Sequence, residues 1–212
     1  MENIKNIILD YGDVIYRLDF HRVHQAFTDL GVKNVEEFFS HAQQDPIFDA
    51  FDKGECSAVE FRNHIREVVG QELSFTDRQI DDAWNALLCG IIPGSHELLI
   101  ALKNHGYRLF LLSNNNELHY AYILNDLKQN HQIANNDVFF EACYYSHLVG
   151  MRKPEKELFQ LVLDNHQLLA DQTLFIDDSP QHLASAESLG IKTALCSREH
   201  TLSQIIYQNH LL

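Results

Sequence analysis

The sequence has few cysteines, and they form no pattern that binds zinc or builds a disulfide framework. The four of them, Cys56, Cys89, Cys143 and Cys196, are scattered over 212 residues without a C-x-x-C pair. This spacing excludes a zinc ribbon and a disulfide-stapled fold, and it implies a reducing compartment. Long apolar runs are also lacking, because the amino-terminal run ends at Asp10 and is neither a signal peptide nor a membrane span of about 20 residues. We therefore expect a cytoplasmic protein without a membrane partner.

Basic residues are scarce as well. The chain has 16 lysines and arginines against 30 aspartates and glutamates, which gives a formal net charge of −14. A surface of this charge repels a phosphate backbone, so a nucleic-acid partner is excluded. A small anionic substrate would need a local device against that field, such as a metal ion, a buried lysine or inward-pointing backbone amides.

Internal repeats and low-complexity segments are absent, and 45% of the residues are hydrophobic. This composition is typical of a globular protein with a packed core. A chain of 212 residues is long enough for one good-sized domain, or for a domain with a smaller insertion. We expect a monomer or a homodimer.

The amino-terminal part of the chain predicts one strand followed by a helical block. Residues 4–10 form a short, β-branched apolar run closed by turn-forming residues. From Phe20 to about Leu88, apolar residues recur at the three-and-four spacing of helices. Breaks at Gly31, Pro46, Gly54 and Gly70 divide this block into about four helices. Its core is predicted to contain the aromatic residues Phe38, Phe39, Phe48, Phe51, Phe61 and Trp84.

The rest of the chain alternates between helix and strand. Helices are predicted at 95–106, 117–127, 153–166 and 180–190, and strands at 107–116, 141–146, 173–180 and 191–196. Such alternation favours an α/β fold with a doubly wound parallel sheet and helices on both faces. We expect residues 1–16 and 92–212 to form this α/β core, with residues 17–91 as a helical cap inserted after the first strand.

Reactive side chains stand where three predicted strands end. Asp10 closes the first strand, Ser113 lies at the end of the next, and Asp177 and Asp178 close a later one. The carboxyl ends of parallel strands line one crevice, so these residues should be neighbours. Lys153 lies in a loop that can reach the same crevice. Crowded carboxylates are costly to ionise unless a cation shares them, and an all-oxygen ligand set favours Mg²⁺.

The residues resemble the haloacid dehalogenase superfamily of phosphohydrolases in order and context, over nearly the whole chain. The motifs are ILDYGDV, LLSN, RKP and FIDDSPQH, each placed after a predicted strand. The resemblance implies a Mg²⁺-dependent phosphatase in which Asp10 attacks phosphorus and forms an aspartyl-phosphate that water hydrolyses. The substrate would be a small phosphorylated metabolite.

The resemblance also implies residue roles. Mg²⁺ would be held by the Asp10 carboxylate, the Gly12 backbone carbonyl and Asp177, and Asp178 would orient metal-bound water. The transferring phosphoryl group would be held by three further groups, the Ser113 hydroxyl, the Asn114 amide and the Lys153 ammonium. More narrowly, the segments DYGDVIYRLDFHRV, LSNNNELH and GMRKPE look like the bacterial α-D-glucose-1-phosphate phosphatases.

Two positions depart from the superfamily pattern. Most of its phosphatases carry a general acid two residues after the nucleophile, where this chain has Gly12, and losing such an acid costs about 10²–10⁴-fold in rate. Asp13 is a candidate replacement, although the turn would direct its side chain elsewhere. A substrate with an acidic leaving group, such as the anomeric hydroxyl of a sugar 1-phosphate, would tolerate the loss. His182 replaces a frequent asparagine and should affect hydrogen bonds around the site rather than the chemistry.

Three other functions compete with the phosphatase. A phosphorylated signalling receiver has its acidic pair on the first strand, whereas here the pair comes last. A haloacid dehalogenase proper lacks the metal, and the presence of Asp177 and Asp178 disfavours it. A non-catalytic phosphometabolite-binding protein that has lost turnover with its general acid stays open.

Overall fold

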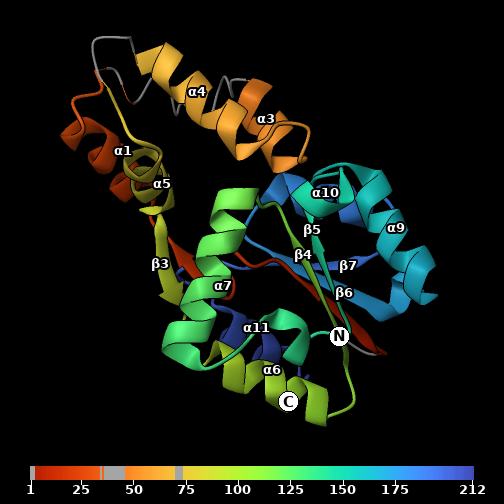
Figure 1. The fold of residues 1–212 in the computed structure, drawn as a ribbon. Coiled ribbons are helices and arrows are strands. Elements are labelled where there is room, and N and C mark those ends of the chain that lie inside the picture. Colours follow the sequence, from red (N-terminus) through yellow and green to blue (C-terminus); the bar gives the residue numbers. More distant parts are fainter. Residues whose placement is uncertain (1–2, 34, 36–45, 70–73) are drawn as a thin grey trace.

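A five-stranded parallel sheet forms the centre of the protein. The structure is a computed structural model that describes residues 3–33, 35, 46–69 and 74–212. The strand order is β5-β4-β1-β6-β7, with every neighbouring pair parallel (Figure 1). The strands are β1 (Asn6–Leu9), β4 (Arg108–Ser113), β5 (Ala142–Tyr145), β6 (Thr173–Asp177) and β7 (Lys192–Leu195). The α/β fold with a parallel sheet is as predicted from the sequence.

Helices cover both faces of this sheet because the side chains of each strand alternate between them. Ile7 and Leu9 of β1 point into one hydrophobic cluster, whereas Ile8 points into the other. The first cluster includes side chains of α6 (Ser95–Asn104), α7 (Glu117–His131) and α11 (Leu202–Gln208). The second includes side chains of α9 (Lys156–His166) and α10 (Pro180–Glu187). Short helical turns complete the core at α8 (Ser146–Val149), η1 (Asn136–Val138) and η2 (Ala170–Gln172).

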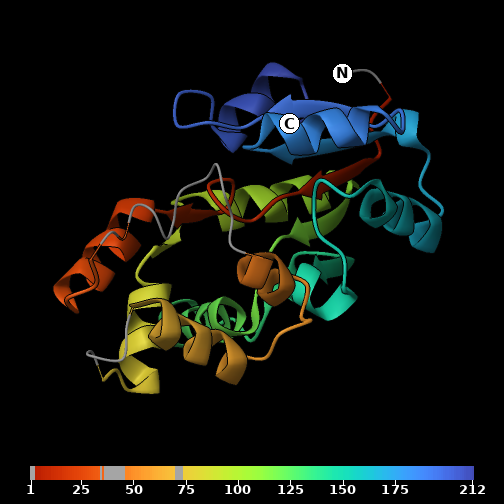
Figure 2. The ribbon, with the colours of Figure 1, turned by 90° about the horizontal axis from the view of Figure 1, so that it is seen from above.

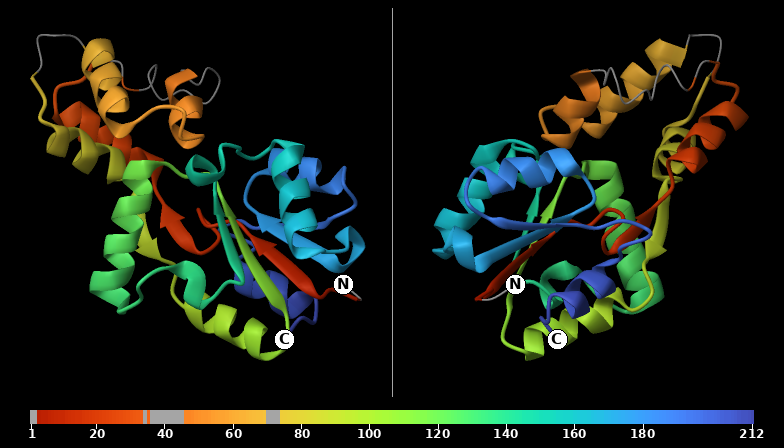
Figure 3. Two further views of the ribbon diagram at one scale, coloured as in Figure 1. Left: turned by 45° about the vertical axis from the view of Figure 1, so that its right-hand side comes forward. Right: turned by 180° about the vertical axis from the view of Figure 1, so that it is seen from behind.

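The segment between β1 and α6 is mainly helical and projects from one end of the sheet (Figures 1 and 3). Its described helices are α1 (Phe20–Asp29), α3 (Pro46–Asp52), α4 (Ala58–Val69) and α5 (Asp77–Asn85). Pro46 is the first residue of α3, where proline is tolerated because the N–H that it lacks would be unpaired in a first turn. The predicted break at Gly70 lies outside the described residues.

Aromatic side chains pack inside this helical insert. Phe51 and Phe61 stack with ring centroids 4.3 Å apart, and Phe48 stacks on Trp84 at 5.5 Å. Phe51, Phe61 and Trp84 are buried, which confirms their prediction as core residues. Phe38 and Phe39, predicted with them, lie outside the described residues.

Two short strands at the base of the insert were not predicted. β2 (Tyr16–Leu18) pairs antiparallel with β3 (Leu88–Ile91). The predicted helical block, which was expected to reach about Leu88, therefore ends earlier, because the Asp19 N–H donates to the Leu87 carbonyl and Leu88 pairs with Leu18. These long-range hydrogen bonds outweigh the helical periodicity of the sequence. The predicted domain boundaries fall at this strand pair, and the division into two domains stays a proposal.

Two further properties bear on the sequence analysis. The four cysteines are all free thiols. Within the described ranges, every helix is too short or too polar to cross a membrane.

Candidate active site

Three carboxylates meet at the carboxyl ends of two adjacent strands. Asp10 directly follows β1, and Asp177 and Asp178 lie at the end of β6, which pairs with β1. The Asp10 N–H donates to the Ile176 carbonyl at 2.9 Å, which extends the strand pairing to this position. One oxygen from each of the three carboxylates lies within 4.8 Å of the other two. The sheet therefore brings these three acids together, as predicted.

Lys153 enters the centre of this cluster. Its Nζ donates to Asp10 Oδ1 and to Asp177 Oδ2, both at 2.6 Å, and its side chain is 1% exposed. A buried ammonium between two carboxylates forms strong charge-assisted hydrogen bonds. Three acids nevertheless face one lysine, so the cluster keeps an excess of negative charge.

The pKa values of the cluster reflect this imbalance. Burial raises the pKa of Asp10 to about 7 even though Lys153 opposes the shift. Burial also acts to raise the pKa of Asp177, but Lys153 and His182 outweigh it and lower the value to about 2. Burial and the charge of Asp177 raise the pKa of Asp178. Burial disfavours the charged form of Lys153, yet the two carboxylates raise its pKa, so the ammonium stays protonated.

The raised pKa of Asp10 predicts a pH dependence of stability in a chelator. Between its ordinary value of 3.8 and about 7, the folded protein holds a proton that the unfolded chain has released. The contribution of Asp10 to stability is therefore present below about pH 4 and is lost as the pH rises through about 7. The melting temperature of Asp10→Asn minus that of wild type should therefore increase as the pH is raised from 5 to 8. A constant difference between the two melting temperatures would contradict this.

Backbone and side-chain hydrogen bonds hold the Lys153 loop and Asp177 in place. The Asn114 side chain accepts from the Lys153 N–H at 2.9 Å and donates to the Lys153 carbonyl at 3.0 Å. On the other side, Asp177 Oδ1 accepts from the Ser179 N–H at 2.8 Å and contacts His182 Nδ1 at 2.9 Å. His182 thus contacts a carboxylate of the cluster from outside, as its sequence position suggested.

Ser113 and Asn114 lie at the neighbouring strand end. Ser113 is buried at the end of β4, and its hydroxyl donates to the Asn114 carbonyl at 3.4 Å. Within the described part of the chain, no hydrogen bond links this hydroxyl to the three acids. Ser113 therefore sits on the strand beside Asp10 without belonging to the ionic cluster.

The end of the Leu18 side chain occupies the space beside Gly12. A Cβ built on it would lie 2.7 Å from Leu18 Cδ1, closer than real Cβ contacts. Leu18 belongs to β2, so packing of this strand fills the space beside the backbone where the superfamily carries its general acid. An aspartate at position 12 would require Leu18 to move.

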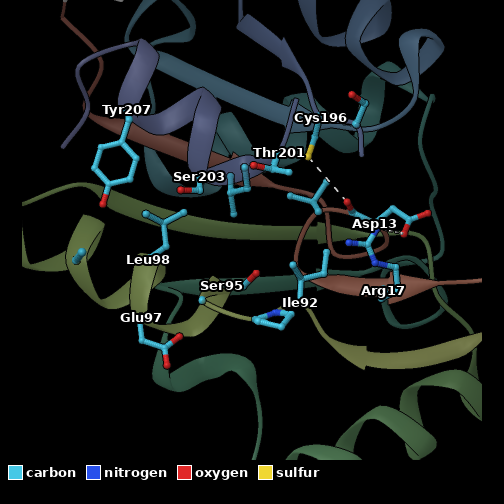
Figure 4. A pocket seen from close by; sticks show the side chains of 16 residues that line it. Asp13, Arg17, Ile92, Ser95, Glu97, Leu98, Cys196, Thr201, Ser203 and Tyr207 are labelled. Atoms are coloured by element: carbon cyan, nitrogen blue, oxygen red, sulfur yellow. Dashed lines mark hydrogen bonds and ion pairs between the residues drawn. The ribbon is translucent and has the colours of Figure 1, made fainter. Parts of the chain in front are cut away.

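The Asp13 carboxylate is held by contacts with β2. Its Oδ1 accepts from the Leu18 N–H at 3.1 Å and lies 3.6 Å from Arg17 Nη1. Figure 4 shows Asp13 and Arg17 at one end of a pocket of about 460 Å³, which also includes Cys196 and the first turns of α6 and α11. None of the three clustered acids lines this pocket. The turn therefore directs the Asp13 carboxylate toward β2, as its geometry suggested.

Two sets of residues near the site were not given a role in the sequence analysis. Arg152, next to Lys153, forms ion pairs with Asp49 and Asp52 of α3. Ser146 Oγ accepts from the Asn115 N–H at 2.8 Å and donates to the Asn115 carbonyl at 2.9 Å. In the sequence, the only features that point to these residues are the arginine in RKP and the asparagine run after LLS. Neither feature indicates which residue the side chain or backbone will contact.

Comparisons with known proteins indicate the family of this chain. A D-ribitol-5-phosphate phosphatase of Bacteroides thetaiotaomicron is 27% identical over 190 residues, 90% of each chain. The crystal structure of an enzyme of the HAD family from the same bacterium, an aspartate-to-alanine mutant in complex with magnesium and inorganic phosphate, matches with a TM-score of 0.87 and 34% identity. The match covers 96% of this chain and 98% of that chain.

A predicted HAD-like hydrolase from Porphyromonas gingivalis matches with a TM-score of 0.85 and 27% identity over 98% of both chains. The model of the family described as haloacid dehalogenase-like hydrolase matches residues 6–196, which span β1 to the end of β7 and include the whole cluster. The chain therefore belongs to the haloacid dehalogenase-like hydrolases.

Proposed function

We propose that this protein is a Mg²⁺-dependent phosphomonoester hydrolase that transfers a phosphoryl group to Asp10. The observation that carries the proposal is the cluster of Asp10, Asp177 and Asp178 around the buried ammonium of Lys153. Relatives named as phosphatases, and a relative crystallised with magnesium and inorganic phosphate, support it.

The donor set fits Mg²⁺. Three carboxylates with oxygens within 4.8 Å of one another are hard ligands, and Lys153 offsets only part of their charge. We propose that Asp10, Asp177 and the Gly12 carbonyl would hold the ion, with Asp178 beside them. When bound, Mg²⁺ supplies positive charge that favours the ionised carboxylates and the phosphoryl oxygens.

The proposed reaction has two steps. An oxygen of Asp10 attacks phosphorus, and the bond from phosphorus to the substrate oxygen breaks, so the substrate oxygen leaves with the electron pair as an alkoxide, which then takes a proton from water. Water then attacks the phosphorus of the aspartyl-phosphate, and cleavage of the bond to Asp10 releases inorganic phosphate. Lys153 lies within 2.6 Å of Asp10 and would offset charge on the phosphoryl oxygens. Ser113 and the Asn114 amide, at the next strand end, would donate hydrogen bonds to them.

The surroundings of Gly12 support a substrate with an acidic leaving group. Leu18 fills the space beside Gly12, and the Asp13 carboxylate is bound to β2. Neither position supplies the acid that protonates an ordinary alkoxide. The anomeric hydroxyl of a sugar is more acidic than a primary alcohol and leaves more readily without a proton. We therefore propose sugar 1-phosphates, the class suggested by the resemblance to glucose-1-phosphate phosphatases, as the preferred substrates.

This proposal predicts a substrate order. We expect kcat/KM to be about tenfold or more higher for hexose 1-phosphates than for the matching 6-phosphates, a fraction of the usual contribution of a general acid. D-ribitol 5-phosphate, the substrate in the name of one relative, is the matched primary phosphate. Equal values for the 1- and 6-phosphates, or a preference for ribitol 5-phosphate, would contradict the leaving-group argument.

The experiment that tests the function is a panel of sugar and polyol phosphates assayed with Mg²⁺ and with a chelator. Release of inorganic phosphate that depends on Mg²⁺ supports the proposal. Absence of turnover on every member of the panel, with Mg²⁺ present, would favour the non-catalytic binding protein.

We also propose a cytoplasmic location. The four free thiols are consistent with the reducing compartment that this location implies.

A further inference from the structure

Helix α3 of the insert is ion-paired to the loop that carries Lys153. Arg152 Nη1 donates to Asp49 Oδ1 at 2.8 Å, and Arg152 Nη2 lies 3.6 Å from Asp52 Oδ2. The Arg152 side chain is only 15% exposed, so solvent screens these pairs less than it screens pairs on an open surface. α3 contacts the core at α8, the short helix that precedes this loop in the sequence, and Figures 1 and 2 show α3 lying beside this part of the core.

A second pair ties the other end of the loop to the same helix. Lys53 Nζ lies 2.6 Å from Glu155 Oε1 and 3.1 Å from Asp49 Oδ2. Arg152 and Glu155 stand on either side of Lys153 and Pro154 in the sequence. The backbone that presents Lys153 to the carboxylates is therefore attached to α3 at both ends.

The insert also approaches the core closely at the end of α3. A Cβ on Gly54 would lie 2.2 Å from the His147 carbonyl oxygen, and Gly54 has a φ of +70°. Only glycine allows this backbone contact. Asp52 Oδ1 also accepts from Asn116 Nδ2 at 3.3 Å, in the loop after β4. The end of α3 therefore packs against the segments that follow β4 and β5.

We infer that Arg152 is a positioning residue that holds helix α3 against the loop carrying Lys153 and so keeps the helical insert in place over the active site. The inference rests on the proposed phosphatase function. Within the part of the chain that the structure describes, the ion pairs of Arg152 go to Asp49 and Asp52 and not to the three acids, whereas Lys153 has its own bonds to Asp10, Asp177 and Asn114. Loss of Arg152 should therefore loosen substrate binding while the chemical groups stay in place.

The test compares Arg152→Gln with a matched control, Arg108→Gln. Arg108 forms a bidentate pair with Glu141 at the opposite end of β4, away from the insert. For the best substrate of the panel, Arg152→Gln should raise KM about tenfold with kcat within about threefold of wild type, whereas the control should change neither. Arg152→Lys should recover part of the loss, because one ion pair can re-form. Asp49→Asn combined with Arg152→Gln should raise KM no further than Arg152→Gln alone.

Two results would overturn the inference. One is an unchanged KM in Arg152→Gln, and the other is a lower kcat with unchanged KM and a lower melting temperature, which is the signature of a purely structural role. If wild type is inactive on the whole panel, the proposed phosphatase function fails. Hydrogen exchange then tests separately whether Arg152 holds α3 against the loop that carries Lys153. The backbone amides of residues 47–52 should then exchange faster in Arg152→Gln than in Arg108→Gln, and equal rates would reject the inference.

Discussion

Asp10→Asn should abolish turnover, with kcat about 10⁴-fold or more below wild type on any substrate of the panel. The amide cannot act as the proposed nucleophile, yet it has nearly the same size and can still contact Lys153. The thermal transition at pH 6 should be nearly unchanged, because folded Asp10 is mostly protonated below about pH 7 and asparagine is a neutral side chain of nearly the same size. Steady-state kinetics and a thermal melt on the same preparation measure both effects.

The matched control is Asp13→Asn. Asp13 lies three residues away, and asparagine keeps an oxygen that can accept from the Leu18 N–H. Activity within about threefold of wild type is expected, since the Asp13 carboxylate is directed toward β2. Wild-type-like activity in Asp10→Asn would overturn the assignment of the nucleophile. A large loss in Asp13→Asn would instead give this residue the role of the missing acid.

Lys153→Met should lose both activity and stability. The substitution removes the only ammonium that contacts Asp10 and Asp177 among the described residues, and it leaves two buried carboxylates without their cation. Breaking a buried ion pair by removing one partner costs about 3–5 kcal/mol. The loss should be larger at pH 8 than at pH 5, because at pH 5 Asp10 can take up a proton. Turnover should fall by several orders of magnitude.

Urea unfolding in a chelator at the two pH values measures the stability change. Lys128→Met on the exposed face of α7 serves as the control, and it should change the free energy of unfolding by less than about 0.5 kcal/mol. A Lys153→Met protein as stable as wild type at pH 8 would show that the ammonium does not compensate the carboxylates.

The meeting of the three acids could be predicted from the sequence because these residues stand at strand ends. Parallel pairing of β1 with β6 is enough to bring Asp10 next to Asp177, whatever the side chains around them. The short apolar runs that mark these strands depend only on local sequence. The parallel sheet, and the meeting of the acids with Lys153, therefore follow from pattern and topology.

Features that depend on long-range partners were not predictable in the same way. β2 and β3 are three and four residues long, and only their pairing with each other stabilises them. α11 was missed although Thr201 and Gln204 form a capping box, since its few apolar residues give a weak periodic signal. Nothing near position 12 in the sequence shows that Leu18 fills the space beside Gly12.

The ion pairs of Arg152 belong to the same class. Asp49 and Arg152 are separated by 103 positions, and a charged residue in a loop gives no indication of its partner. The sequence could thus predict which groups gather at the sheet, but not how the insert is attached to them.

The central claim is that Asp10 accepts the phosphoryl group while Lys153 and the other two acids surround it. The most direct test is a crystal structure of the wild-type protein with Mg²⁺ and beryllium fluoride, an analogue of the phosphoryl group. Beryllium is expected to be bonded to an Asp10 oxygen, with Mg²⁺ contacting Asp10 and Asp177. Beryllium fluoride on another residue, or Mg²⁺ bound away from these carboxylates, would contradict it.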